Sequence, residues 1–220
     1  MIGDIVNIAS AKKTTIDSLL SLLLPLVHVS DTAVAVSIAG ESGSGKSVIA
    51  GALRRSLEDR GFKTPLLQQD DYFVWPPRTN DRMRREDIAH VGVSEVRMDL
   101  LDLHVGQIIH GASWITKPLV FYQEDRIASE DIDVAGTRFV IVEGTYTSLL
   151  TNIHKRVFID RTYLDTRPDR MRRSRDEKDE FIERVLAVEH DIIAPHGGLA
   201  DIVVDSFFGV SRRLPAELRG

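Results

Sequence analysis

The sequence contains no cysteine, and this absence excludes several kinds of chemistry at once. A chain without cysteine forms no disulfide bond, binds no metal through thiolates and uses no cysteine nucleophile. The absence also fits a reducing compartment, so we expect a cytoplasmic protein. Aromatic residues are few, at 6%, whereas the hydrophobic and charged fractions, 43% and 28%, are those of an ordinary globular protein. We therefore expect a chain that folds by itself.

The chain also lacks a long hydrophobic run. The strongest one, Leu19 to Val29, contains Pro25 and His28 and is well short of the ~20 residues that cross a bilayer. The N-terminal segment does not resemble a secretory signal, because Asp4 precedes any lysine. The net charge of -5 gives no general attraction for polyanions. We therefore expect neither a membrane nor a nucleic acid as a partner.

Strand-like and helix-like patterns alternate along the chain. The run TAVAVSIA at 32–39 consists of small and β-branched residues and contains no charge. Such a run is typical of a strand buried on both faces of a parallel sheet. Further strands are expected at 65–69, 138–142, 156–160 and 200–205, and helices at 14–27, 46–60, 94–110 and 181–195. Residues 114–122 fit either a strand or a hairpin. The alternation predicts a parallel sheet with right-handed crossovers, and the length of 220 residues favours one domain.

A glycine-rich segment follows the first of these strands and opens the next helix. It reads GESGSGKS and satisfies the pattern GxxxxGK[ST] in the strand-to-helix context that the motif requires. Glycines let the backbone wrap so that its N–H groups point at phosphate oxygens, and the helix N-terminus adds partial positive charge. Lys46 is predicted to reach the β- and γ-phosphates, and Ser47 to ligate Mg²⁺. The predicted phosphate loop consists of Gly40, Glu41, Ser42, Gly43, Ser44, Gly45, Lys46 and Ser47.

Acidic residues follow two of the other predicted strands. QDDYF at 69–73 comes one helix and one strand after the phosphate loop, and VEGTY at 142–146 follows a later strand. The carboxyl ends of parallel strands meet at one edge of a sheet, so we expect Asp70 beside the γ-phosphate. A carboxylate in that place can accept the proton of a substrate hydroxyl and help to hold the metal.

These segments, together with an arginine-rich stretch at 165–176 that ends Arg-Asp, resemble the uridine kinase and phosphoribulokinase superfamily, which includes nicotinamide riboside kinases. The resemblance spans residues 34–205. It implies an ATP- and Mg²⁺-dependent kinase that phosphorylates a hydroxyl of a small-molecule acceptor. It also implies that Asp70 is the general base, with Asp71 as a weaker alternative, and that Glu143 orients Mg²⁺ together with Ser47 and Asp70. Relatives often form dimers or tetramers, so a homo-oligomer is consistent with the resemblance.

The predicted fold is a P-loop NTPase-type three-layer α/β/α domain over residues 1–220, with a mostly parallel sheet and a helical, arginine-rich lid. Its expected parts are an N-terminal helical extension at 1–31, a strand, phosphate loop and helix at 32–60, an acceptor-binding region at 72–126 and the lid at 161–179. In the family the lid closes over ATP and places arginines on the transferring phosphoryl group. Arg167, Arg170 and Arg175 match best by spacing. Of these, the resemblance implies nucleotide binding by Arg167 and catalytic roles for Arg170 and Arg175, beside Lys46 and Asp70.

The acceptor region departs from the uridine kinase pattern. Uridine kinases bind the ribose hydroxyls through an aspartate in an Asp-x-Pro-Asp-like stretch, but the corresponding residues here, 90–97, read HVGVSEVR. Asp87 or Glu95 could take the role after a small shift, or either could be an exposed acid at a helix start. Residues 117–126 resemble the family segment that meets the base. The candidate substrate-binding residues are Asp71, Tyr72, Tyr122 and Arg126, with Trp75 as a further aromatic that could stack on a planar substrate.

Three functions remain open from the sequence. The first is a kinase for a nucleoside of the uridine or cytidine type or for a related metabolite. The second keeps the same chemistry but uses a different acceptor, such as pantothenate or a sugar phosphate. The third is a regulatory nucleotide-binding protein that has lost phosphoryl transfer. The acids at positions 70 and 143 and the arginine-rich lid favour a kinase, because a nucleotide sensor needs no acceptor base.

Overall fold

A computed structural model describes residues 13–172 and 180–213, and its centre is a six-stranded sheet. The strands lie in the order β2-β5-β1-β6-β7-β8, and all pairs are parallel except β7 with β8. Their bounds are β1 Val34–Gly40, β2 Leu66–Gln68, β5 Phe139–Glu143, β6 Lys155–Ile159, β7 Ile202–Val204 and β8 Val210–Arg212. The predicted α/β fold with a mostly parallel sheet is confirmed.

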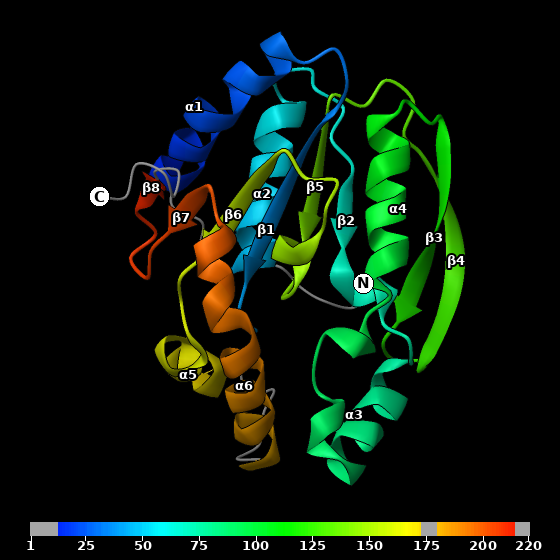
Figure 1. The fold of residues 1–220 in the computed structure, drawn as a ribbon, viewed down its shortest axis with the longest axis vertical. Coiled ribbons are helices and arrows are strands. Elements are labelled where there is room, and N and C mark those ends of the chain that lie inside the picture. The colour runs from blue at the N-terminus through cyan, green and yellow to red at the C-terminus, as the bar shows by residue number, and fades with distance from the viewer. Residues whose placement is uncertain (1–12, 173–179, 214–220) are drawn as a thin grey trace.

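Helices cover both faces of this sheet (Figure 1). Alternate residues of β1 explain the three layers: Val36 and Ile38 belong to one core with α1 and α2, whereas Ala35 and Ala39 belong to a second core with α4. Because both faces of β1 are covered by these cores, every residue of the strand is buried, as its apolar sequence predicts. The helices are α1 Lys13–Val29, α2 Lys46–Glu58, α3 Pro77–Glu86, α4 Met98–Ile109, α5 Tyr163–Arg172 and α6 Glu180–Ile193. Within the described residues, none of them is long and apolar enough to cross a membrane.

The elements missing from the sequence prediction are polar or short. A second, two-stranded sheet pairs β3 (Trp114–Phe121) with β4 (Arg126–Asp133) in an antiparallel hairpin, and only its first strand was open to prediction. Strand β4 reads RIASEDID and has no buried residue, so it carries little apolar signal. Helix α3 reads PRTNDRMRRE, with only Asn80 buried, and therefore lacks the apolar periodicity of a packed helix.

The sheet register brings distant segments to the carboxyl ends of the central strands. Ile38 of β1 lies opposite Glu143 of β5, and Gln68 of β2 lies opposite the same glutamate. The phosphate loop leaves β1 at Gly40, which lies opposite Ile159 of β6. Helices α3, α5 and α6 extend beyond this end of the sheet (Figure 1). Ligand sites of open α/β sheets lie at such carboxyl ends.

Candidate active site

The phosphate loop has the backbone that an anion cradle requires. Gly43 and Gly45 adopt φ values of 80° and 104°, in the left-handed region that glycine enters without a side-chain clash, and Gly45 leads directly into α2. Lys46 is 9% exposed, and its Nζ donates to the backbone oxygen of Glu41 at 2.9 Å, which keeps the ammonium inside the loop. The buried hydroxyl of Ser44 has no hydrogen-bond partner among the described residues. A cation, an unpaired donor and a helix N-terminus thus converge, as a phosphate group needs.

Beside the loop lies a corner of hydroxyl and carboxylate oxygens that can hold Mg²⁺. Ser47 Oγ donates to Glu143 Oε1 at 3.0 Å, and Gln68 Nε2 donates to the same oxygen at 3.1 Å. Burial raises the pKa of Glu143, the nearby charge of Asp70 raises it further, and Lys46 opposes both effects. In the described part of the chain, no group of three or more His, Asp or Glu residues is placed to bind a metal. The corner instead fits Mg²⁺, which protein sites commonly bind through one or two carboxylates plus substrate phosphates.

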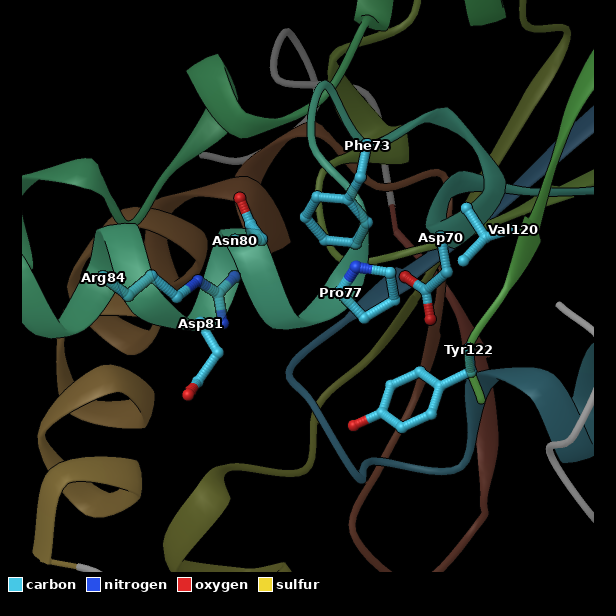
Figure 2. A pocket seen from close by; sticks show the side chains of 8 residues that line it. All are labelled: Asp70, Phe73, Pro77, Asn80, Asp81, Arg84, Val120 and Tyr122. Atoms are coloured by element: carbon cyan, nitrogen blue, oxygen red, sulfur yellow. The ribbon is translucent and has the colours of Figure 1, made fainter. Parts of the chain in front are cut away.

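A pocket of about 230 Å³ opens next to Asp70. Figure 2 shows the Asp70 carboxylate and the Tyr122 ring on one side, with Asn80 and Arg84 of α3 farther along the wall. We call this the acceptor pocket, and it is lined by Asp70, Phe73, Pro77, Asn80, Asp81, Arg84, Val120 and Tyr122. Asp70 is half-buried, so its carboxylate belongs both to the pocket wall and to the surroundings of Glu143.

Glu95 holds the α3 wall of the acceptor pocket in place. It is completely buried and accepts hydrogen bonds from Asn80 Nδ2 at 2.7 Å, Gly92 N at 2.7 Å and Arg84 Nη2 at 3.0 Å, with a further contact from Arg84 Nε. Asp87 instead accepts from Ala89 N at 2.9 Å at the start of a 3₁₀ turn. These contacts give both acids local partners, so we do not assign either of them to ribose hydroxyls. The alternative of an exposed acid is wrong for Glu95.

Two of the candidate substrate residues have buried environments that the sequence did not reveal. Asp71 is 2% exposed and accepts from Lys117 Nζ at 2.8 Å and from Val120 N at 3.1 Å, which ties the Asp70 turn to β3. Tyr72 is completely buried, and its hydroxyl lies 2.9 Å from His104 Nδ1. A side chain without exposed surface has no face for a substrate to stack on. We therefore leave Asp71 and Tyr72 out of the proposed substrate-binding site. Their contacts with β3 and α4 instead fix the position of the turn that carries Asp70.

The Asp71–Lys117 pair yields a stability prediction. Lys117→Met is expected to lower the free energy of unfolding by about 3–5 kcal/mol, because it leaves a buried carboxylate without its cation. Chemical denaturation would measure the change. Arg126→Met is the matched control: Arg126 forms an exposed ion pair with Glu124 at 2.9 Å, worth at most about 1 kcal/mol. Equal unfolding midpoints for the two variants would contradict the anchoring role of Lys117.

The remaining acceptor candidates lie near the mouth of the pocket. Tyr122 follows the end of β3, is 56% exposed and lines the pocket. Arg126 starts β4, where its guanidinium pairs with Glu124 and lies 4.1 Å from the centre of the Phe121 ring. Trp75 is 44% exposed on the turn before α3. Of these three, Tyr122 is among the lining residues, and substrate binding by all three stays a prediction.

The lid arginines fall at the edge of the described structure. Arg167 lies on α5, and its Nε is 3.8 Å from Glu183 Oε2 of α6. Arg170 is part of α5, but its side chain lies outside the described residues, as does the whole of Arg175. Helix α5 begins where Tyr163 N donates to Glu41 Oε2 at 2.6 Å, so the phosphate loop anchors the start of the lid. The roles of the three arginines on a phosphoryl group stay predictions.

Several contacts to the phosphate loop come from residues that sequence reasoning did not single out. On α6, Glu189 Oε2 accepts from Ser42 Oγ at 2.8 Å, and His190 Nδ1 lies 2.7 Å from Glu41 Oε1. After β7, the Phe208 ring lies 3.7 Å from where a Cβ on Gly45 would stand, and the Arg161 guanidinium lies 4.9 Å from the centre of that ring. The sequence carries no local motif for the contacts to the loop, because Glu189, His190 and Phe208 follow it by more than 100 residues.

Sequence comparisons find kinases among the proteins similar to this chain. No family model matches it. It is 28% identical over 185 residues to the bifunctional alpha-galactosidase/sucrose kinase of Mediterraneibacter gnavus, a match that covers 78% of this chain but 20% of that enzyme. It is 25% identical over 188 residues to the uridine kinase of Clostridium novyi, covering 84% of this chain and 80% of the relative.

Solved structures agree with the sequence comparisons in fold. A possible uridine kinase from Bacillus stearothermophilus superposes with a TM-score of 0.65 at 17% identity, covering 87% of this chain and 97% of that one. Phosphoribulokinase from Rhodobacter spheroides gives a TM-score of 0.64 at 12% identity, covering 86% and 83%. The fold and the phosphate loop are those of P-loop kinases. In sequence the chain is similar to uridine kinases, and in fold it is similar to a possible uridine kinase and to phosphoribulokinase, which confirms the resemblance read from its motifs.

Proposed function

We propose that the protein is an ATP- and Mg²⁺-dependent kinase that phosphorylates a hydroxyl of a nucleoside or a related small metabolite. The observation that carries the proposal is the position of Asp70. Its carboxylate lines the acceptor pocket, and its charge acts on Glu143, which in turn accepts a hydrogen bond from Ser47 of the phosphate loop. One carboxylate therefore borders the places that acceptor, metal and phosphate would occupy.

The residues divide the chemistry between binding charge and moving a proton. Loop N–H groups and Lys46 would bind the phosphate oxygens, and Ser47, Glu143 and Asp70 would hold magnesium directly or through water. Magnesium bound there would supply positive charge against the oxygens of the transferring group. Asp70 would accept the proton of the acceptor hydroxyl as that oxygen forms its bond to phosphorus. Phosphoryl transfer relies mainly on positioning and charge stabilisation, and this set of groups supplies both.

The charges around the acceptor pocket favour an acceptor without phosphate or carboxylate. Among the described lining residues, Asp70 and Asp81 are acids and Arg84 is the cation. Arg84 is already held by Glu95 and lies 3.7 Å from Glu189. A negatively charged acceptor would meet these carboxylates without an unpaired cation among the described lining residues. Phe73 and Tyr122 offer aromatic surface to a planar group. These features support a nucleoside over a sugar phosphate or pantothenate.

A panel of acceptors tests the proposal. ADP release from ATP and Mg²⁺ would be measured with nucleosides, pantothenate, sugar phosphates and simple polyols, each against a reaction without acceptor. We expect release to depend on an uncharged acceptor, with nucleosides the most effective. Strong release with only a sugar phosphate would overturn the assignment of acceptor class. Nucleotide binding without acceptor-dependent release across the panel would point instead to a regulatory nucleotide-binding protein.

A further inference from the structure

Glu189 of α6 touches both halves of the candidate active site. Its side chain is almost completely buried, with Oε2 accepting from Ser42 Oγ of the phosphate loop at 2.8 Å. Its other oxygen, Oε1, lies 3.7 Å from Nη2 of Arg84, which lines the acceptor pocket. A single carboxylate therefore connects the expected nucleotide side with the expected acceptor side.

The acceptor side of this connection is itself rigidly held. Arg84 is only 18% exposed, and its guanidinium binds both oxygens of Glu95, which also fixes Asn80 of the same helix. Arg84 therefore balances the charges of two buried carboxylates, Glu95 and Glu189. An acceptor that enters the pocket beside Arg84 would act on this cation. Any shift of Arg84 changes the charge balance at Glu189.

The phosphate-loop side is held by two neighbouring residues of α6. Glu189 binds Ser42, and the next residue, His190, lies 2.7 Å from the carboxylate of Glu41. Because Glu41 and Ser42 are adjacent in the loop, α6 and the loop are joined at two points. These two side-chain contacts link the position of α6 to adjacent residues of the loop.

Tyr146 supplies the cluster with an alternative donor. Its hydroxyl is buried and has no hydrogen-bond partner among the described residues. Burial and the charges of Glu189 and Glu95 raise the pKa of Tyr146 well above its usual value, so the hydroxyl stays protonated. Because the charges of Glu189, Glu95 and Arg84 all act on this hydroxyl, it is the donor that a second arrangement of the cluster would use if Arg84 turned toward an acceptor. Coupling between sites requires such alternative arrangements.

We propose that Glu189 is a positioning residue that couples the acceptor pocket to the phosphate loop, so that nucleotide and acceptor bind cooperatively. The proposal rests on the proposed function for the identity of the two ligands. Glu189 touches neither reacting atom; it acts through Ser42 and Arg84. By reciprocity, a change at either end must alter binding at the other.

Nucleotide affinity in a double-mutant cycle tests the coupling without any acceptor. Binding of ADP with Mg²⁺ would be measured calorimetrically for the wild type, Arg84→Met, Glu189→Gln and the double variant. Loss of Arg84 leaves the Glu189 charge uncompensated beside the phosphate loop, so we expect the affinity to fall about 10-fold. Glutamine at 189 keeps a partner for Ser42 and needs no cation. In that background Arg84→Met should leave the affinity unchanged.

The cycle has clear contrary outcomes. An equal loss of affinity in both backgrounds, or no loss in the wild-type background, would overturn the role of Glu189. Asp191→Asn is the matched control, since Asp191 lies on the same helix, close to Glu189 in sequence, with its side chain exposed; the nucleotide affinity of this variant should equal that of the wild type. Unfolding curves for each variant would show that the comparison is made between folded proteins.

A reciprocal experiment covers the case in which Arg84→Met does not fold. Ser42→Ala removes only the loop end of the connection, and we expect it to raise the acceptor KM several-fold, although Ser42 does not line the acceptor pocket. The same substitution in the Glu189→Gln background should raise it no further. An unchanged acceptor KM in Ser42→Ala would refute the coupling. Failure to find any acceptor would refute the proposed function, while the nucleotide cycle would still decide the role of Glu189.

Discussion

Lys46→Ala is expected to lower turnover by about 10³-fold or more while the protein stays folded. The Lys46 ammonium is buried and held inside the phosphate loop by the Glu41 carbonyl, where few other groups can replace its charge. The loss should appear in kcat, since the charge that develops on the transferring phosphoryl group would lose its stabilising cation. Steady-state kinetics with the acceptor found in the panel, together with a thermal melt, would measure both parts of the prediction.

A surface lysine provides the control for this result. Lys63 forms an exposed ion pair with Asp133 at 3.0 Å, on the side of the molecule where the β3–β4 hairpin meets β2. Lys63→Ala should therefore retain wild-type turnover. Normal turnover in Lys46→Ala would sink the assignment of residues 40–47 as the phosphate loop of a kinase, whatever the behaviour of Lys63→Ala.

Asp70→Asn is expected to lower kcat by about 10²–10⁴-fold and to leave nucleotide binding intact. Asparagine has nearly the same shape but cannot accept the proton of the acceptor hydroxyl. The acceptor pocket keeps its other lining residues, so acceptor KM should change much less than kcat. Turnover measured over a range of Mg²⁺ concentrations separates the two roles proposed for Asp70. Recovery of activity at high Mg²⁺ would assign it to the metal and not to proton transfer.

Asp81→Asn is the companion variant for Asp70→Asn. Asp81 lines the same pocket but forms an exposed ion pair with Arg85 of α3 at 2.8 Å. Because Asp81 has no contact with the Glu143 corner, its substitution should act on acceptor KM and leave kcat within a few-fold of the wild type. Equal losses of kcat in the two variants would show that pocket charge, and not a base at position 70, controls turnover.

The phosphate side of this site could be predicted because its signals are local in the chain. The glycines of the loop must sit between a buried strand and a helix start, and those elements have apolar patterns that can be read from neighbouring residues. Glu143 and Asp70 were predictable for a related reason: both follow strands whose carboxyl ends a parallel sheet brings together. The order of β2, β5 and β1 in the structure places them beside the loop.

The acceptor side could not be predicted in the same way, because burial there depends on residues far apart in sequence. The sequence suggests Tyr72 as a surface on which a substrate could stack, but in the structure the side chain is buried and its hydroxyl contacts His104 of α4. The sequence suggests Glu95 as an acid at a helix start, but in the structure it accepts hydrogen bonds from Arg84 and Asn80 of α3. Helix α3 itself has a polar sequence that gives no apolar period. Tertiary contacts, and not local preference, decide these positions.

Strand β2 makes the candidate site depend on a short edge strand of the central sheet. This strand is three residues long and forms one outer edge of the sheet, and β5 is its only partner among the described strands. It holds Gln68 against Glu143 and carries the chain directly into Asp70. Short edge strands open locally at a lower free energy than a sheet interior. A brief opening of β2 would therefore move Asp70, the proposed base, and loosen the proposed metal corner together, so the proposed chemistry requires this edge to be closed.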